Sequence, residues 1–426
     1  MPRTSLSGRD YLILSQLALG NVITLVTFTC IAPYYPFEGS KKGLSEGQTG
    51  FVFGIFQLTS FLTSPFCGKL TAKVGSKNMI VGGLFLAALS SVIFGLLEVV
   101  PDHLFFATSM IVRVFMALGN SSFVIACFTL ISKRFREDCL TIISVIEVSS
   151  GLGCLIGPPL GGSLYEIGGF KLPMIVLGTS LFLVAIISAI FIPNDEQEED
   201  IEKKPSSGTV RILKVPELWL YLYTIFSSAV TVTFLDPTLA EHVKQFNYGP
   251  FLVGLLFLIC GACYAVSALG LGFLMRRWKN RLMLVIIGVA LSIVATFLIG
   301  PAPFSGIDTN IPMICVALVV MGISCAALYV PSFENCRDAI MKTDIPERYD
   351  IESSVSGVFQ SSWALGAFVG PTFAGYASEK IGLAMTATFL SACQLIYLVI
   401  LLAYFMWRKN KNSSVTCSGK SIDNKC

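Results

Sequence analysis

The chain has 426 residues, of which 54% are hydrophobic and only 13% are charged, and its mean hydropathy is +0.73. A soluble protein of this length exposes far more charge, so the composition excludes a soluble domain and indicates an all-α membrane protein surrounded by the lipid bilayer. The formal net charge of +3 is too small to indicate a nucleic-acid partner, and we expect none.

Apolar runs of about 20 residues, the length that crosses hydrocarbon as a helix, follow one another along the chain. Twelve can be marked, at 11–35, 47–70, 78–100, 104–132, 139–164, 172–193, 215–240, 249–275, 282–302, 311–333, 351–377 and 383–407. A charged segment separates the first six from the last six. We therefore expect an N-terminal six-helix bundle (1–193), a linker (194–214), a C-terminal six-helix bundle (215–408) and a tail (409–426).

Lys and Arg are distributed unevenly between the two sides of these spans. With both termini on the same side as the linker, that side holds 24 of the 30 basic residues and the other side holds five. Basic residues are retained on the cytoplasmic side during insertion. The pattern predicts a multi-pass protein with both termini, the linker and the tail in the cytoplasm.

A glycine-rich segment of the fifth span, 153–162, returns 213 residues later in the eleventh span, and Glu166 maps onto Glu379 by the same shift. Such stripes let helices approach closely, and a proline bends its helix. Two like halves can rock around a shared cavity, as in secondary transporters, although the stripes could serve packing alone. The residues concerned are Gly153, Gly157, Pro158, Gly161 and Gly162, and in the second half Gly366, Gly370 and Pro371.

Other chemistries find little support in the sequence. Most of the thirteen cysteines lie within the predicted spans, where cysteine packs as a small apolar residue. Cys260 and Cys263 have metal-like spacing, but no second pair or histidine accompanies them, so we expect no metal. A phosphate loop is absent, as is a convincing nucleophile and base pair, so we expect neither an enzyme nor a cofactor. A proton gradient would then drive any transport.

Ionisable residues within membrane helices are costly and are candidates for function. Glu147 lies in the cytoplasmic part of the fifth span, Arg113 in the outer half of the fourth, and Asp236 in the outer part of the seventh. A carboxylate in a low-dielectric site can carry a proton, whereas the alternative for Glu147 is an ion pair that holds helices together. Arg113 fits a structural role as well as a coupling role.

Asp236 directly precedes Pro237, which disfavours helical backbone at the aspartate and removes a helical hydrogen-bond donor. A broken helix with a carboxylate at the break can coordinate a cation, and the alternative is an aspartate that caps the helix end. The acids outnumber the one base, which favours a small organic cation. Aromatic residues could add cation–π contacts or serve only as interface packing. They are Tyr34, Tyr35, Tyr264, Tyr329 and Trp363.

The motifs resemble those of the major facilitator superfamily over essentially the whole chain. The helix 5 motif GxxxGPxxGG is complete at Gly153, Gly157, Pro158, Gly161 and Gly162. Arg113 with Gly119 matches the RxxxxxG pattern linked to proton coupling. The gating-loop motif GxxxD[RK]xG[RK][RK] is matched by Gly68, Lys73, Gly75 and Lys77, but Ala72 replaces its aspartate and puts the charge-based latch in doubt. The resemblance implies the major facilitator fold, with twelve transmembrane helices in two pseudo-symmetric bundles.

Within that superfamily the chain is similar to the vesicular amine transporters, and among them to the vesicular polyamine transporter branch. The similarity rests on residues 234–239, FLDPTL, and on residues 149–153 and 157–162. The acids that the monoamine and acetylcholine branches carry in helices 1, 10 and 11 appear here as Gly20, Ala326 and Gln360. Phe56 stands where those branches have a helix 2 lysine. This pattern disfavours a simple monoamine or acetylcholine carrier.

The sequence and the resemblance together predict a monomeric, proton-coupled antiporter that moves an organic cation, such as spermine or spermidine, from the cytoplasm into an acidic compartment. The resemblance implies a secretory or synaptic-type vesicle or another acidic organelle, with the plasma membrane as the alternative. A drug or organic-anion carrier of the same superfamily is the second candidate. A non-transporting receptor or scaffold is the candidate from another class.

Overall fold

The computed structural model describes residues 7–135, 138–193, 212–277, 280–306, 309–341 and 348–422. The first half contains α1 (Gly8–Thr29), α2 (Tyr35–Lys41), α3 (Glu46–Val74), α4 (Ser76–Gly95), η1 (Leu96–Val99), α5 (Asp102–Arg134), α6 (Cys139–Gly168) and α7 (Lys171–Phe191). The second half contains α9 (Pro216–Thr233), α10 (Leu235–Lys244), α11 (Pro250–Arg277), α12 (Arg281–Ile299), η2 (Pro303–Ser305), α13 (Ile311–Met341) and α14 (Arg348–Ile422).

The predicted all-α membrane fold is confirmed. Within the described residues, eleven helical segments are long and apolar enough to cross a membrane. The longest of them, Val355–Arg408, holds two crossings, because Gly382 has φ 79° and ψ 158° and interrupts the helix. A positive φ of this kind is readily adopted only by glycine. With this division, the segments correspond to the twelve spans that the apolar runs predict.

Several helix boundaries differ from the predicted spans. The first span is followed by a separate short helix, α2, which begins at Tyr35. Pro36 is accommodated in the first turn of this helix, where a missing backbone N–H costs no hydrogen bond. The seventh span is divided at Phe234 into α9 and α10. At the other end, α14 continues to Ile422, so that most of the predicted tail extends this helix. Residues 194–211 of the predicted linker lie outside the described residues.

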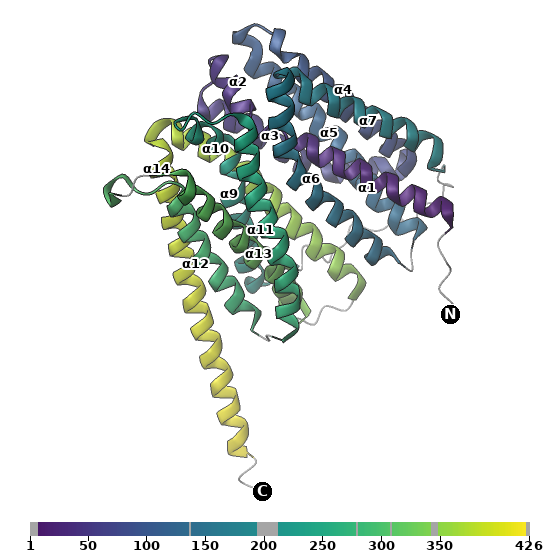
Figure 1. Cartoon of the computed structure of the whole chain (residues 1–426). Helices are drawn as coiled ribbons and strands as arrows, with labels where there is room; N and C mark the ends of the chain where they lie inside the picture. The colour runs from purple at the N-terminus through teal and green to yellow at the C-terminus, as the bar shows by residue number, and fades with distance from the viewer. Residues whose placement is uncertain are drawn as a thin grey trace.

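Helices α1–α7 and α9–α14 form two bundles that diverge from each other (Figure 1). Within each bundle one helix packs on two others: α4 contacts α5 and α7, and α12 contacts α13 and α14. The bundles meet mainly through α3 against α14 and through α6 against α11. We call the side where α1 begins and α14 ends the terminal side, and the side of α2 and α10 the distal side.

The repeated glycine stripes occupy equivalent places in the two bundles. A Cβ atom added at Gly153 would lie 2.6 Å from the Cβ of Leu25, and one at Gly157 would clash with Thr29, so the stripe of α6 packs directly on α1. In the second half, Gly366 and Gly370 pack in the same way on α9. Small residues that allow backbones to approach are the usual means of helix association in lipid.

The two bundles are in tight contact on the distal side and separate toward the terminal side. Each of the four interface helices carries a glycine on the distal side. A Cβ atom added at any of these glycines would collide with the backbone of the other bundle: Gly50, Gly162, Gly254 and Gly375. Each helix also carries a glycine nearer the terminal side at which an added Cβ atom would meet no neighbouring atom within 4 Å: Gly68, Gly151, Gly270 and Gly357. The space between the bundles therefore opens toward the terminal side.

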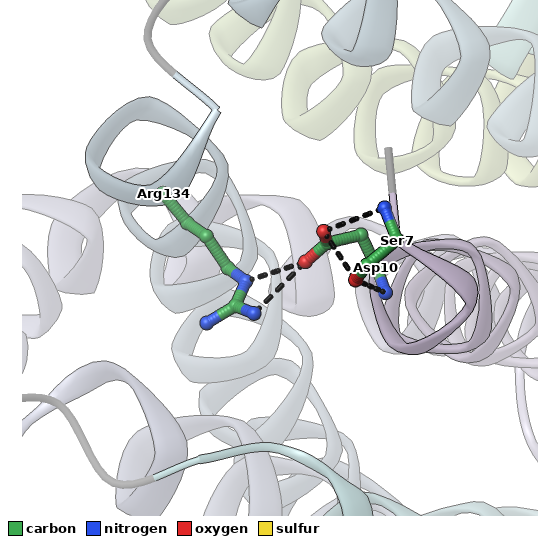
Figure 2. A network of polar contacts seen from close by, with 3 residues as sticks. All are labelled: Ser7, Asp10 and Arg134. Carbon is green, nitrogen blue, oxygen red and sulfur yellow. Dashed lines mark hydrogen bonds and ion pairs between the residues drawn. The ribbon is translucent and has the colours of Figure 1, made fainter. Parts of the chain in front are cut away.

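Polar contacts fix the ends of the helices on each side. On the terminal side, Asp10 accepts hydrogen bonds from Ser7, with which it forms a capping box, and from Arg134 at the end of α5 (Figure 2). On the distal side, Lys41 of α2 donates to Glu38 at 2.7 Å and to Tyr165 of α6 at 3.0 Å. The Glu38 carboxylate, followed by Tyr165, raises the pKa of the Lys41 amine above its usual range.

Candidate functional site

Arg113 lies in α5 at the centre of the first bundle and is fully buried. Its Nε donates to the carbonyl of Val52 in α3 at 3.4 Å. The guanidinium lies over the rings of Phe56 and Phe28, at 4.8 and 5.4 Å from their centroids. Among the described residues, neither Nη1 nor Nη2 has a hydrogen-bond partner. A buried cation held by two aromatic faces and one carbonyl keeps unused capacity to bind an anion.

Asp236 lies in the first turn of α10, directly after the division of the seventh span. Phe234, at the division, has φ −54° and ψ −31°, so the chain stays close to helical geometry and does not unwind as the break-forming proline suggested. The side chain of Asp236 is half-buried, and among the described residues no hydrogen bond or ion pair occupies it. The capping alternative finds no cap hydrogen bond here.

The structure brings Arg113 and Asp236 near each other across the boundary between the bundles. They form no ion pair within 4.0 Å, but they are close enough for each to act electrostatically on the other. Opposite charges attract each other more strongly in a low-dielectric region than in water. A proton or a cation that neutralises Asp236 would therefore also change the environment of Arg113.

Glu147 is exposed on α6, in the part of the helix that faces the opening between the bundles. It lies within electrostatic range of Tyr264 of α11 and Tyr329 of α13. The backbone beside it is held by buried Asn21 of α1, which donates to the carbonyl of Ile146 at 2.9 Å. A carboxylate from the first bundle thus lies within electrostatic range of aromatic side chains from the second.

The aromatic side chains near Glu147 form a cluster of their own. Tyr329 packs edge-to-face on Phe359 and on Trp363, with centroids 5.1 and 5.4 Å apart. The predicted candidates Tyr264 and Trp363 therefore both belong to the region around Glu147. Tyr34 and Tyr35 do not, because both are fully buried in the distal core of the first bundle. Their rings stack or pack there on aromatic neighbours.

Cys154, which sequence reasoning did not single out, lies near enough to both carboxylates to be influenced by their charges. Its side chain is exposed, and both Asp236 and Glu147 lie within electrostatic range of it. Seven residues separate Glu147 from Cys154 on α6, which is about 10 Å along a helix. The two carboxylates thus lie at different depths of one region. No local pattern in the sequence marks Cys154, because its relation to Asp236 depends on how the two bundles pack.

The gating-loop residues lie on the terminal side between α3 and α4. Gly75 has φ 89° and ψ 149° and makes the sharp turn between these helices, a conformation that favours glycine. Gly68 faces open space, Lys73 is exposed and Lys77 is half-buried. Neither lysine forms an ion pair within the part of the chain that the structure describes, which agrees with the replacement of the motif's aspartate by Ala72.

Metal binding has no geometric support in the described ranges, where no three His, Cys, Asp or Glu side chains are grouped to hold an ion. Cys260 and Cys263 instead pack beside Gly322 of α13, where a Cβ would lie 2.8 Å from the Cβ of Cys263. The described site therefore consists of carboxylates, one guanidinium and aromatic rings.

Comparison with known proteins gives consistent matches. The family model described as Major Facilitator Superfamily matches residues 17–344. The human protein named MFS-type transporter SLC18B1 is 31% identical over 419 residues, covering 96% of this chain and 91% of that protein. The mouse protein named synaptic vesicular amine transporter is 22% identical over 386 residues, covering 87% of this chain and 69% of that protein.

Among solved structures, a bacterial homolog of the human lysosomal transporter Spinster, in an inward-facing and occupied conformation, is similar in fold. It has a TM-score of 0.73 and 15% sequence identity, and the match covers 95% of this chain and 98% of that one. The comparisons thus confirm the sequence resemblance to the superfamily and to its vesicular amine transporters.

Proposed function

Because this chain belongs to the Major Facilitator Superfamily, whose members are transporters and not enzymes, we propose that it is a proton-coupled antiporter for organic cations. The proposed substrates are polyamines such as spermine and spermidine, or related amines. The observation that carries the proposal is that Glu147 lies within electrostatic range of Tyr264 and Tyr329 of the opposite bundle, in a space that opens toward the termini. A carboxylate and aromatic faces together form a favourable site for an ammonium group.

The separation of Glu147 and Asp236 supports a substrate with more than one amine. Glu147 lies in the terminal-side part of α6 and Asp236 in α10 on the distal side, so a short monoamine could neutralise only one of them. A linear polyamine could place one ammonium at Glu147 and another toward Asp236. Unpaired intramembrane charges are costly, so engaging both acids adds to affinity.

Proton coupling is proposed to act through Asp236 and Arg113. When Asp236 is ionised, it attracts both the guanidinium and a substrate amine. Protonation from the acidic side removes this attraction and favours release of the amine, and loss of the proton toward the cytoplasm restores the site. Glu147 can take the same role from the terminal side. No cofactor is needed in this scheme, because the proton gradient supplies the free energy.

The proposed orientation places the terminal side in the cytoplasm and the distal side in the lumen of an acidic vesicle or related organelle, with the protein acting as a monomer. The excess of Lys and Arg on the terminal side supports this orientation. The printed name of the synaptic vesicular amine transporter supports a vesicle membrane. Microscopy of the tagged protein against organelle markers, with protease protection of each terminus, tests both points.

The decisive experiment is uptake in proteoliposomes under an imposed proton gradient, with a panel of polyamines, diamines of increasing chain length, monoamines and organic anions. We expect gradient-driven uptake of polyamines, and better uptake of diamines long enough to reach both carboxylates than of short ones. Counterflow of labelled polyamine without a gradient separates transport from simple binding. Transport of monoamines alone, or no counterflow at all, would contradict the proposal.

One observation favours a second candidate, an organic-anion carrier. Arg113 is a fixed cation whose two Nη atoms have no partner among the described residues, so an anion could bind beside it. The same panel decides between the two candidates. The second candidate would be supported if the protein took up anions, if Arg113→Gln abolished this uptake and if Glu147→Gln left it intact.

A further inference from the structure

The same contact between the bundles occurs twice. It is made by Glu166 and by Glu379, the glutamates related by the 213-residue shift. Glu166 lies near the distal end of α6, and its Oε1 accepts a hydrogen bond from the backbone N–H of Phe251 at 2.9 Å. Glu379 lies near the distal turn of α14, and its Oε2 accepts from the backbone N–H of Gly47 at 3.1 Å. Each carboxylate thus binds a helix that belongs to the other bundle.

The two amides occupy the same position in their helices. Gly47 is the second residue of α3, and Phe251 is the second residue of α11. The first N–H groups of a helix have no partner within it and carry a partial positive charge, so an anion there is stabilising. In α11 the preceding residue, Gly249, has no side chain that could cap the helix. The cap comes from Glu166 of the opposite bundle instead.

The neighbouring contacts repeat with the same symmetry. Phe251 follows Gly47 by 204 residues, which is also the shift from Gly68 to Gly272 at the other ends of these helices. Gly50 packs on the carbonyl of Pro371, and Gly254, 204 residues after Gly50, packs on that of Pro158. The carboxylate contacts are therefore part of a duplicated interface and not two coincidences.

A third pair of contacts completes this interface. Gly375 packs on the carbonyl of Glu46, and Gly162 packs on that of Pro250. Gly375 and Gly162 are again 213 residues apart, and Glu46 and Pro250 are 204 apart. All three contact pairs lie on the distal side, where the bundles are closed in this structure.

From these contacts we infer that Glu166 and Glu379 form a paired distal gate, a conformational device that stabilises the state open toward the termini. Each carboxylate holds the first turn of a helix in the other bundle, and both contacts must break when the bundles separate on the distal side. In the distal-open state the backbone N–H groups of Gly47 and Phe251 lose these carboxylates, while Ser45 still caps α3 through the N–H of Gln48. The gate thus sets the balance between the two access states for any substrate, and it does not depend on the identity of the transported molecule.

The surroundings of the two carboxylates indicate a modest contribution from each. Glu166 is exposed and has no ion pair among the described residues. Glu379 is partly exposed, and Lys380 lies 3.9 Å from it. Two more acids lie near the start of α3, because the charges of Glu241 and Glu379 both act on Glu46. Water screens such groups, so each contact changes the equilibrium constant between the two access states by a small factor. The two contacts together change it by the product of the two factors.

The test is hydrogen–deuterium exchange of the full-length protein in lipid nanodiscs, read by mass spectrometry. We expect Glu166→Ala and Glu379→Ala each to raise exchange about threefold in the distal parts of α3 and α11, and the double variant about ninefold. Exchange in the terminal-side parts of α3, α6 and α11 should fall at the same time, because those surfaces close when the distal side opens. The Gln variants, whose amide oxygen still accepts the hydrogen bond, should show smaller changes.

Glu98→Ala is the matched control, since Glu98 is an exposed carboxylate on the distal side without a contact to the second bundle. It should leave exchange on both sides unchanged. A local increase at the first turns of α3 and α11 with unchanged exchange on the terminal side would overturn the inference, because the glutamates would then be caps without influence on access. If an Ala variant does not fold, the Gln variants apply the same criterion.

Discussion

The charged side chains within the membrane spans have neighbours that come from distant parts of the sequence. Arg113 is held by Val52, Phe28 and Phe56 and acts electrostatically on Asp236. Glu147 acts electrostatically on Tyr264 and Tyr329 of the second bundle. Sequence reasoning identified the three ionisable residues because charge within an apolar run is conspicuous. It could not identify the aromatic partners of Arg113, because phenylalanine is common in every span.

At the residue scale, Asp236→Asn should weaken amine binding. The substitution keeps the size of the side chain but removes the negative charge that attracts both Arg113 and the substrate in a low-dielectric region. We expect the KM for polyamine uptake to rise about tenfold or more, and Asp236→Glu to be milder. Indifference of uptake to Asn at this position would show that the cation binds elsewhere.

Glu147→Gln separates proton coupling from substrate binding. If this carboxylate exchanges a proton during the cycle, the variant should lose uphill, gradient-driven accumulation but retain substrate exchange, which needs no net proton movement. Accumulation and counterflow are measured in the same proteoliposomes, with Glu98→Gln as the control on an exposed distal carboxylate. Loss of both activities would assign Glu147 to the substrate alone, and unchanged accumulation would leave coupling to Asp236 and Arg113.

Among the elements, α6 and α14 show how the repeated stripe functions. Each packs its glycines on the first helix of its own bundle, α1 or α9, and presents another part of the same segment to the opposite bundle. The motif predicted the close approach correctly, because glycine in a membrane helix removes the side chain that separates backbones. The partners of each glycine were not predictable from the stripe. A break in the seventh span was expected at Asp236, but the division of α9 from α10 lies two residues earlier, at Phe234, and its geometry is near-helical.

The stripe of α6 gives a prediction at the scale of the element. Gly157→Leu should place a side chain against Thr29 of α1, where even a Cβ clashes, at a cost of about 1–3 kcal/mol. We expect the variant to reach the membrane while the initial rate of transport falls at least about tenfold. Gly82→Leu in α4 is the control, because the space beside Gly82 is open. Near-normal transport by Gly157→Leu would contradict a mechanical role for this contact.

For the whole molecule, the important feature is the difference between the two ends of the interface. The distal contacts are backbone against backbone, whereas the terminal-side glycines of the same four helices face open space. A packed contact and an open space can exchange places when two rigid bundles rotate against each other. This arrangement connects the duplicated sequence to alternating access.

Gly50→Leu tests that connection. The new side chain would enter the contact with Pro371 and disfavour the state closed on the distal side, so exchange of distal amides should rise while exchange on the terminal side falls. Gly68→Leu on the same helix should leave the observed state intact, because nothing lies within 4 Å of that position. Equal exchange patterns in the two variants would show that this interface does not govern access.

The sequence by itself determined that the chain is a membrane protein with twelve spans in two related halves, and it located the glycine stripes and the intramembrane charges. These properties are local, since hydropathy over about 20 residues decides which segments enter the bilayer. Only the tertiary structure decided which side chains meet. Contacts such as Glu166 with Phe251, or Glu379 with Gly47, join separate spans of different bundles, and in lipid such pairing depends on how whole helix surfaces pack and not on any local pattern.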